Sequence, residues 1–345
     1  MRLAIALAMK GKSERTQSVE LFIRHLTESS NEETVNLHDQ EPKKPQPAPK
    51  KPNPAPKINQ SDKEKKSKSL YIWGIGGAVA LALLIGIIKF CGRSSGGEAS
   101  PETSDSTAMV DTYYANGVSF EMVRVEGGTF TMGATAEQGS DASEDEKPAH
   151  QVTLSSYMIG KTEVTQELWE AVMGKSVSQI ASELGYSTYG EGADYPMYFV
   201  SWEDCQAFIT KLNALTGKNF RLPTEAEWEF AARGGINSQG FKYSGSNTID
   251  DVAWYDDSTT HPVATKASNE LGIYDMSGNV WEWCNDWKGS YTSTLQTNPT
   301  GTNRGLSRVN RGGSWYNDAI GCRVSYRNNN SPTYSTNYLG LRLAL

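Results

Sequence analysis

The residues with the most legible chemistry lie near the end of the chain, between Tyr316 and Tyr338. Tyr, Asn, Ser and Thr fill most positions there, while Lys, Glu, Gln, Met and Trp do not occur. Tyr gives rigid contact area at low entropic cost, and Asn and Ser give adaptable hydrogen bonds, as in antibody paratopes. None of these five types has a codon that ends in C, so the stretch could have arisen by substitution in AAC codons. We interpret it as a recognition surface; an ordinary polar loop is the alternative, because loops favour the same residues.

The cysteines and histidines indicate little redox or metal chemistry by themselves. Cys205 lies on an apolar helix face and Cys284 follows Trp-Glu-Trp, so both are typical of small buried hydrophobic residues. One disulfide could form among Cys205, Cys284 and Cys322, but the sequence does not say which pair would form it. The histidines are scattered along the chain, so the sequence shows no histidine-based iron site.

Length and charge exclude some classes of partner and indicate an anchor. The chain has 345 residues and a formal net charge of −7 without a strongly basic field, which argues against nucleic acid as a partner. Residues 70–88 are uncharged and rich in Gly, Ala, Leu and Ile, which predicts one transmembrane helix. A buried core helix is the alternative, but core helices are usually amphipathic. Lysines cluster at 63–68 and only Lys89 and Arg93 follow closely, so the N-terminus is predicted to be cytoplasmic and the C-terminal domain extracytoplasmic.

Shifts in composition divide the chain into four parts. Residues 1–69 form a predicted cytoplasmic segment that contains a linker rich in Pro and Lys. The span at 70–88 follows, and residues 89–117, rich in Gly, Ser, Glu and Thr, are predicted to be a flexible tether. Residues 118–345 then form one globular domain.

Strand signals open this domain. Residues 120–125 alternate as a half-buried strand does, and the glycines at 127–128 predict a turn. Residues 129–133 are then the expected hairpin partner, and residues 151–159 are a further strand candidate.

Three helices carry recognisable start signals. Thr165 precedes a predicted helix at 166–173, and Thr224 opens a capping box before the helix that contains Trp228. Ser201 and Asp204 form a capping pair for a helix at 202–215. Its predicted buried face consists of Trp202, Cys205, Phe208, Leu212 and Leu215.

Several long motifs in one order give the chain a specific resemblance. They are Gly-Gly-Thr-Phe-Thr-Met-Gly at 127–133, Glu-Val-Thr-Gln at 163–166, Arg-Leu-Pro-Thr-Glu-Ala-Glu-Trp-Glu at 221–229, Gly-Ile-Tyr-Asp-Met-Ser-Gly-Asn-Val-Trp-Glu-Trp at 272–283, Arg-Gly-Gly-Ser-Trp at 311–315 and Leu-Gly-Leu-Arg at 339–342. This series resembles the sulfatase-modifying factor family, which includes the formylglycine-generating enzymes. The resemblance implies an α+β domain with a C-type lectin-like fold of the formylglycine-generating-enzyme subtype, preceded here by the single transmembrane helix.

The resemblance also implies a calcium site. Its predicted ligands are the side chains of Asp275 and Glu282 and the backbone carbonyls of Gly278 and Val280, because Ca²⁺ prefers hard oxygen ligands from one loop. The alternative is that the two carboxylates only cap turns and pair with Arg. A second calcium site of the family would fall near residues 251–252, but the segment that completes it is shortened, so we do not expect it.

The copper chemistry of the family is not expected here. Its formylglycine-generating members hold Cu(I) between two cysteines, and Cys322 matches the second of them while Asn317 stands at the first position. An amide oxygen is a poor ligand for a soft cuprous ion. Ser314 matches an active-site serine of the family, but no base lies beside it in sequence.

Two function classes follow from the resemblance. The Tyr- and Asn-rich end is similar to the variable proteins of diversity-generating retroelements, which display a diversified ligand-binding surface. On this hypothesis the contact residues, which would bind a protein or glycan, are Tyr316, Asn317, Asp318, Ile320, Gly321, Tyr326, Asn328, Asn329, Asn330, Tyr334, Thr336, Asn337 and Tyr338. The framework is Trp315, Cys322, Arg323, Pro332 and residues 340–342. The alternatives are a formylglycine-generating oxidase that depends on Cys322 and Ser314, and a non-catalytic envelope assembly subunit.

Overall fold

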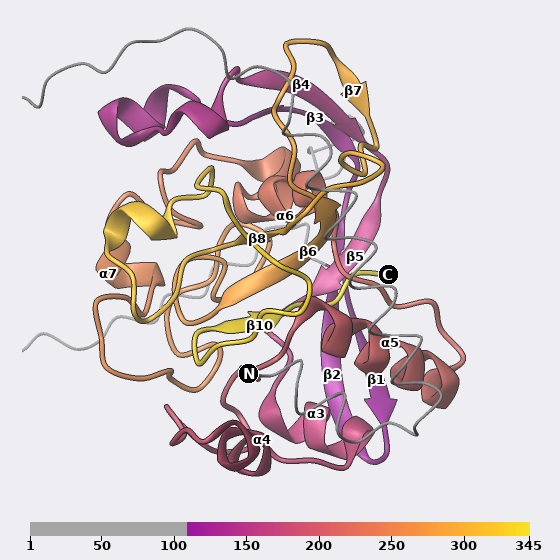
Figure 1. Cartoon of the computed structure of the whole chain (residues 1–345). Coiled ribbons are helices and arrows are strands. Elements are labelled where there is room, and N and C mark those ends of the chain that lie inside the picture. The colour runs from indigo at the N-terminus through magenta and orange to yellow at the C-terminus, as the bar shows by residue number, and fades with distance from the viewer. Residues whose placement is uncertain (1–108) are drawn as a thin grey trace, which may run out of the picture. The chain divides into compact units, whose positions relative to one another are not determined.

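The computed structural model describes residues 109–345 (Figure 1). The predicted cytoplasmic segment and the span at 70–88 lie outside the described residues. Within 109–345, the structure contains no helix whose length and apolar character would allow it to cross a membrane.

An antiparallel sheet of three strands opens the domain, in the order β1 (Val110–Ala115), β2 (Val118–Val125) and β5 (Tyr157–Gly160). Asn116 and Gly117 join the first two strands with φ of 47° and 89°. Positive φ at both central residues is the hairpin geometry that Asn-Gly favours. Residues 110–115 therefore belong to the folded domain and not to the tether expected over 89–117.

A second sheet has the order β3 (Gly128–Met132), β4 (His150–Leu154) and β7 (Gln296–Thr297). The expectation that β3 pairs with the preceding strand β2 is wrong, because β3 pairs with β4. At Gly127 an added Cβ would stand 2.5 Å from the carbonyl oxygen of Leu154, so this glycine permits a close backbone approach where the chain enters the second sheet. The single strand predicted at 151–159 is in fact β4 and β5.

The predicted helices are confirmed with their caps. They are α3 (Gln166–Met173), α5 (Trp202–Thr216) and α6 (Glu225–Ala232), and the side chains of Thr165, Ser201 and Thr224 each accept a backbone N–H of the first turn. The predicted face of α5 needs one correction. Leu215 is 47% exposed, and Ile209 is buried instead.

Two further helices have no counterpart in the sequence predictions. The first is α4 (Val177–Leu184), which a capping box of Ser176 and Gln179 opens. The second is the short α7 (Ile249–Val252). Short 3₁₀ turns complete the helical elements: η2 (Ala136–Asp141), η3 (Glu144–Glu146), η4 (Gly235–Asn237) and η5 (Ala319–Cys322).

The C-terminal segment forms a third sheet with the order β10 (Leu339–Leu341), β6 (Trp281–Trp287), β8 (Arg308–Arg311) and β9 (Asn328–Asn330). The last strand, β10, runs parallel to β6, while the other pairs are antiparallel. In Figure 1 the yellow C-terminal chain therefore returns through the middle of the domain. The mixture of small sheets and peripheral helices confirms the α+β class.

The core is built from large side chains of segments far apart in sequence. One cluster joins Trp169 and Phe208 to Trp281 and Trp283, and a second joins Trp228 and Phe230 to the strands of the second sheet. A small third cluster contains Tyr243, Val252 and Cys322, with Tyr255 and Ala319 packed against it. This third cluster holds the loop around α7 against η5, at the predicted recognition segment.

Candidate functional site

The predicted recognition segment alternates between exposed and buried side chains. Tyr316 is 66% exposed, Ile320 43% and Tyr334 39%. Trp315 just before them, and Cys322 and Arg323 between Ile320 and Tyr334, are buried; all three are predicted framework residues. The backbone is therefore anchored at one set of positions while another set faces solvent.

Three tyrosines of this segment form one aromatic patch, which we define as Tyr316, Tyr334 and Tyr338. The rings of Tyr316 and Tyr338 stack with centroids 5.7 Å apart and planes within 8°. The hydroxyls of Tyr334 and Tyr338 lie 3.4 Å apart. Stacked aromatic pairs add stability beyond the area that they bury. The structure thus brings positions 316, 334 and 338 together.

Trp281 of β6 supports the patch from below. Its indole Nε1 donates to Oδ1 of Asn317 at 2.8 Å, and its backbone N–H donates to the carbonyl of Tyr338 at 2.8 Å. The ring of Tyr326 lies 6.0 Å from the Trp281 ring. One buried tryptophan therefore fixes three predicted contact positions relative to one another.

Aromatic residues outside the predicted set extend this surface. Tyr189 stacks on Trp315 at 5.5 Å, and the backbone N–H of Phe199 donates to the carbonyl of Thr336. Tyr186, which is 60% exposed, stacks on Phe199. Sequence reasoning missed these residues, although residues 186–199 are also rich in Tyr and contain two Gly. That compositional likeness is the signal that could have found them.

Other members of the predicted set do not join the patch. Asn328, Asn329 and Asn330 form β9, and the side chain of Asn329 donates to Ser307. Gly321 is buried, and an added Cβ there would stand 3.2 Å from the Cβ of Asn317. Gly321 therefore belongs with the framework and not with the contact residues.

Two more of the predicted contact residues hold the local backbone. The carboxylate of Asp318 accepts the backbone N–H groups of Ile320 and Gly321, so Asp318 caps η5. The carbonyl of Asn337 accepts from the indole of Trp315 at 3.3 Å. Asp318 is nevertheless exposed, so its charge also faces solvent.

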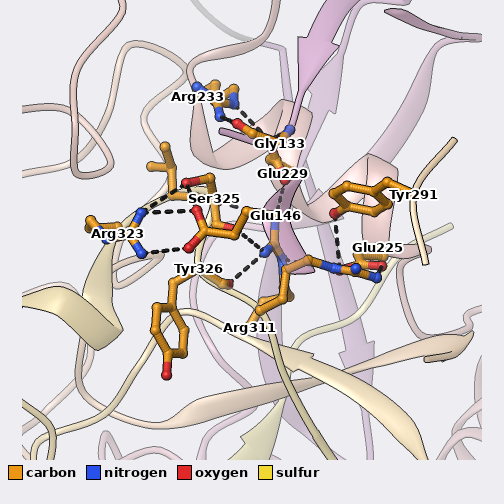
Figure 2. A network of polar contacts seen from close by, with 12 residues as sticks. Gly133, Glu146, Glu225, Glu229, Arg233, Tyr291, Arg311, Arg323, Ser325 and Tyr326 are labelled. Atoms are coloured by element: carbon orange, nitrogen blue, oxygen red, sulfur yellow. Dashed lines mark hydrogen bonds and ion pairs between the residues drawn. The ribbon is translucent and has the colours of Figure 1, made fainter. Parts of the chain in front are cut away.

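Buried arginines anchor the segment between its exposed positions (Figure 2). Arg323 donates to both oxygens of Glu146 at 2.6 and 2.9 Å, and Arg327 donates to both oxygens of Glu225 at 2.6 and 2.7 Å. Arg311 pairs with Glu229 and also donates to the carbonyls of Ser325 and Tyr326, just before Arg327. Bidentate pairs of this kind fix orientation as well as charge.

The charges of this network are compensated. Burial raises the pKa of Glu225, but the charge and hydrogen bonds of Arg327 outweigh burial and lower it to about 2. Burial acts in the same direction on Glu146, and the hydrogen bonds of Arg323 and Ser325 leave its pKa below the usual range. Both carboxylates are therefore ionised at neutral pH, as ion pairing with arginine requires.

The residues at the copper position of the family do not fit a cuprous ion. Cys322 is fully buried, and burial raises the pKa of its thiol to about 12, so it is not a thiolate at neutral pH. Oδ1 of Asn317 accepts hydrogen bonds from Trp281 and from Oγ of Ser314 at 2.7 Å. Cys205, Cys284 and Cys322 are free, so no disulfide joins cysteines within 109–345. The hydroxyl of Ser314 is buried and its hydrogen bond goes to the amide of Asn317.

The residues at the predicted calcium position fit the ion poorly. Both oxygens of Glu282 accept from Arg342, at 2.7 to 3.0 Å, and one of them also accepts from the indole of Trp228 at 2.6 Å. Asp275 is buried and accepts the backbone N–H of Ala264. The described residues contain no group of three or more His, Cys, Asp and Glu side chains that could hold a metal. The guanidinium of Arg342 neutralises the Glu282 carboxylate, which was predicted to bind calcium.

A cavity of about 210 Å³ lies elsewhere in the domain. Glu225, Asp286, Tyr291 and Arg327 are among the residues that line it. None of the predicted contact residues contributes to its lining. The aromatic patch is thus a surface feature that is separate from this cavity.

Comparisons with known proteins agree with this architecture. Residues 113–345 match the family model described as the sulfatase-modifying factor enzyme 1-like domain. The chaperone protein LppX of Paenibacillus barcinonensis is 35% identical over 262 residues, which cover 61% of this chain and 83% of LppX. The formylglycine-generating enzyme of Streptomyces coelicolor is 30% identical over 287 residues, which cover 64% of this chain and 88% of that enzyme.

A solved structure extends the likeness to variable proteins. Treponema denticola variable protein 1 superposes with a TM-score of 0.59 and 35% identity, over 69% of this chain and 99% of that protein. Fold and site together define a C-type lectin-like domain of the formylglycine-generating-enzyme subtype. The chain belongs to the sulfatase-modifying factor enzyme 1-like family, and within this fold it resembles the variable proteins.

Proposed function

We propose that the domain is a non-catalytic binding module that displays a diversified ligand-binding surface at its C-terminal end. The observation that carries the proposal is the division of residues 314–338 into buried anchors and exposed positions. Tyr316, Ile320 and Tyr334 face solvent, while Arg323 and Arg327 hold the same segment through buried ion pairs. Such an arrangement permits side-chain exchange at the surface without loss of the fold. The expected ligand is a protein or a glycan.

The chemistry at positions 317 and 322 supports this proposal over an oxidase. A single buried thiol with a raised pKa and an amide already bonded to Trp281 offer no pair of thiolates for copper. We therefore expect no conversion of a sulfatase cysteine to formylglycine. Mass spectrometry of a sulfatase peptide incubated with the protein, copper and oxygen measures this directly. Product formed at a rate that depends on Cys322 would overturn the proposal.

A library experiment tests the display role. We would randomise Tyr316, Ile320 and Tyr334 in one library and the framework residues Trp315, Cys322 and Arg323 in a second, matched library. Exposed positions tolerate substitution because the substitutions there usually change the free energy of unfolding only slightly. Most members of the first library should stay soluble and folded, and most of the second should not. Equal losses in both libraries would contradict the division into surface and framework.

We also propose that residues 70–88 anchor the domain to a membrane, with the N-terminus in the cytoplasm. The uncharged run and the lysines that precede it support the proposal. Membrane fractionation of the full chain and of a variant without residues 70–88 tests it. The full chain should sediment with membranes and the variant should not. A full chain in the soluble fraction would contradict the anchor.

A further inference from the structure

The loop that carries the end of α7 lies directly against the recognition segment. The backbone N–H of Asp256 donates to the carbonyl of Asn317 at 2.8 Å, and that of Asp257 donates to the carbonyl of Trp315 at 2.7 Å. Val252 and Tyr255 pack with Cys322 and Ala319 in the third core cluster. This loop therefore lies beside residues 315–317, which include Tyr316 of the aromatic patch, although the two segments are far apart in sequence.

The border is acidic. Asp250, Asp251, Asp256 and Asp257 are all exposed in this loop, and Asp318 is exposed in the recognition segment itself; we call these five residues the acidic rim. The backbone N–H of Ser258 and the ring of His261 hold the pKa of Asp257 below its usual range. Asp257 is therefore charged at neutral pH.

Few cations offset this charge. Within residues 109–345, no Lys or Arg forms a salt bridge with a member of the acidic rim, and His261 alone lies within ion-pair distance of Asp257, at 2.9 Å. Lys266 is the neighbouring base, but its ammonium donates to the backbone carbonyl of Asp250 and lies 4.2 Å from the ring of Trp254. The arginines of the recognition segment, Arg323 and Arg327, are buried and neutralised by Glu146 and Glu225. The patch and its rim thus present tyrosine faces and carboxylates to solvent.

We propose that the acidic rim directs the variable surface toward positively charged, arginine- or lysine-rich segments of partner proteins. Tyrosine faces attract guanidinium and ammonium groups, and carboxylates pair with them. Complementary charge of this kind mainly raises association rate and selects among partners. The four loop members of the rim lie outside the predicted contact residues, so on the proposed function their charge is present whichever side chains the contact positions carry. This inference rests on the proposed binding function and adds the class of ligand.

The test uses the full-length chain in a non-ionic detergent and three short fluorescent peptides of equal length. One alternates Arg with Gly and Ser, and the other two carry Glu or Gln in place of Arg. Fluorescence anisotropy should show binding of the Arg peptide at low ionic strength, no binding of the Glu peptide, and weakening of the Arg peptide by about tenfold near physiological salt, where charges beyond ~8 Å are screened. Equal binding of the Arg and Gln peptides would overturn the inference, and so would tight binding of a neutral oligosaccharide without dependence on salt.

Matched variants locate the effect. Asp256→Asn with Asp257→Asn keeps the shape of the rim and should weaken binding of the Arg peptide about fivefold at low salt, the size expected for two charges a few ångströms from the ligand. Asp111→Asn with Glu170→Gln removes the same charge from exposed positions on β1 and α3, and should change binding less than about twofold. Equal loss in the two double variants would mean that only net charge matters, which overturns the proposal.

A third variant separates this inference from the binding function on which it rests. In Tyr316→Ser/Ile320→Ser/Tyr334→Ser the rim is intact and the patch is lost. If this variant binds the Arg peptide as the unchanged protein does, the patch is not the recognition surface, and the proposed function fails along with its ligand class. If the triple variant loses binding of the Arg peptide while Asp256→Asn/Asp257→Asn binds it as the unchanged protein does, the function stands and the acidic rim has no role.

Discussion

The aromatic patch and the buried arginine network occupy the same stretch of chain but follow opposite rules. In the patch, Tyr316 and Tyr334 expose large side chains, and both contact the half-buried Tyr338 without any ion pair. In the network, Arg323 and Arg327 are enclosed and each meets a carboxylate from another part of the chain. This difference indicates that, within one segment, the exposed residues are available for recognition while the buried residues stabilise the fold. It predicts that substitutions only a few positions apart will differ greatly in their effect.

The largest effect is expected for Arg323→Met. The substitution leaves the carboxylate of Glu146 buried without its cation, and removing one partner of a buried pair costs about 3–5 kcal/mol of the free energy of unfolding. Urea unfolding of the two proteins measures this difference.

A double variant sharpens this prediction. Arg323→Met with Glu146→Gln leaves no buried charge, so it should recover a large part of the lost stability. If the single variant unfolds at the same urea concentration as the unchanged protein, the arginine network does not anchor the segment. If the double variant is as unstable as the single one, lost packing and not the stranded charge explains the cost.

Asp286→Asn should have a smaller effect of opposite sign. Burial, and then the charge of Glu225, raise the pKa of Asp286 to about 8. Because the folded state holds this proton more tightly than the unfolded state, the stability contribution is present below pH ~4 and is lost as pH rises through 8. Asparagine does not ionise and keeps an acceptor for the backbone N–H of Glu225, which Asp286 now accepts at 3.1 Å. The variant should therefore gain stability relative to the unchanged protein as pH rises from 4 to 8, by at most about 1.4 kcal/mol for each pH unit.

Thermal melts at a series of pH values test the Asp286 prediction. The midpoints of the two proteins should coincide near pH 4 and separate toward pH 8. Parallel curves across this range would mean that Asp286 is ionised in the folded protein at little cost. The network would then tolerate an uncompensated carboxylate, and the contrast with the patch would be weaker.

The exposed triple variant Tyr316→Ser/Ile320→Ser/Tyr334→Ser should be nearly neutral for folding. Exposed substitutions usually change stability by less than about 0.5 kcal/mol each. Trp281→Ala, which removes the support beneath the patch, should cost about 3–5 kcal/mol in the same assay. Tyr338 is left unchanged in this variant because it is half-buried and packs against the first core cluster. A triple variant as unstable as Trp281→Ala would place these side chains in the core.

The smallest effect is expected from calcium. Arg342 already neutralises Glu282, so added Ca²⁺ would have to displace a buried guanidinium before it gained that ligand. Melts with Ca²⁺ and with EDTA should share one midpoint in protein shown to be metal-free at the start. A higher midpoint with Ca²⁺ would establish the site predicted at residues 275–282, because a ligand that binds the folded state raises its stability.

Local signals in the sequence predicted the elements that depend on neighbouring residues. The caps at Thr165, Ser201 and Thr224 join groups three residues apart, so the helix starts follow from the sequence directly. The Asn-Gly hairpin at residues 116–117 and the capping box at Ser176 also depend on neighbouring residues, so the sequence carries their signals too. The pairing of β3 with β4 could not be predicted from local sequence, because packing between distant segments determines which strands pair.

By itself the sequence determined the family, the α+β class and the chemical character of the C-terminal segment, because motifs and composition are properties of contiguous residues. Only the tertiary structure decided which polar residues of that segment face solvent. Asn317 is turned toward the interior, because its side-chain oxygen accepts a hydrogen bond from Trp281. Gly321 packs closely against Asn317. Tyr189 and the acidic loop at 250–257 lie beside this segment through contacts between residues far apart in sequence. Long-range packing sets such neighbours, and no periodicity within one segment encodes them.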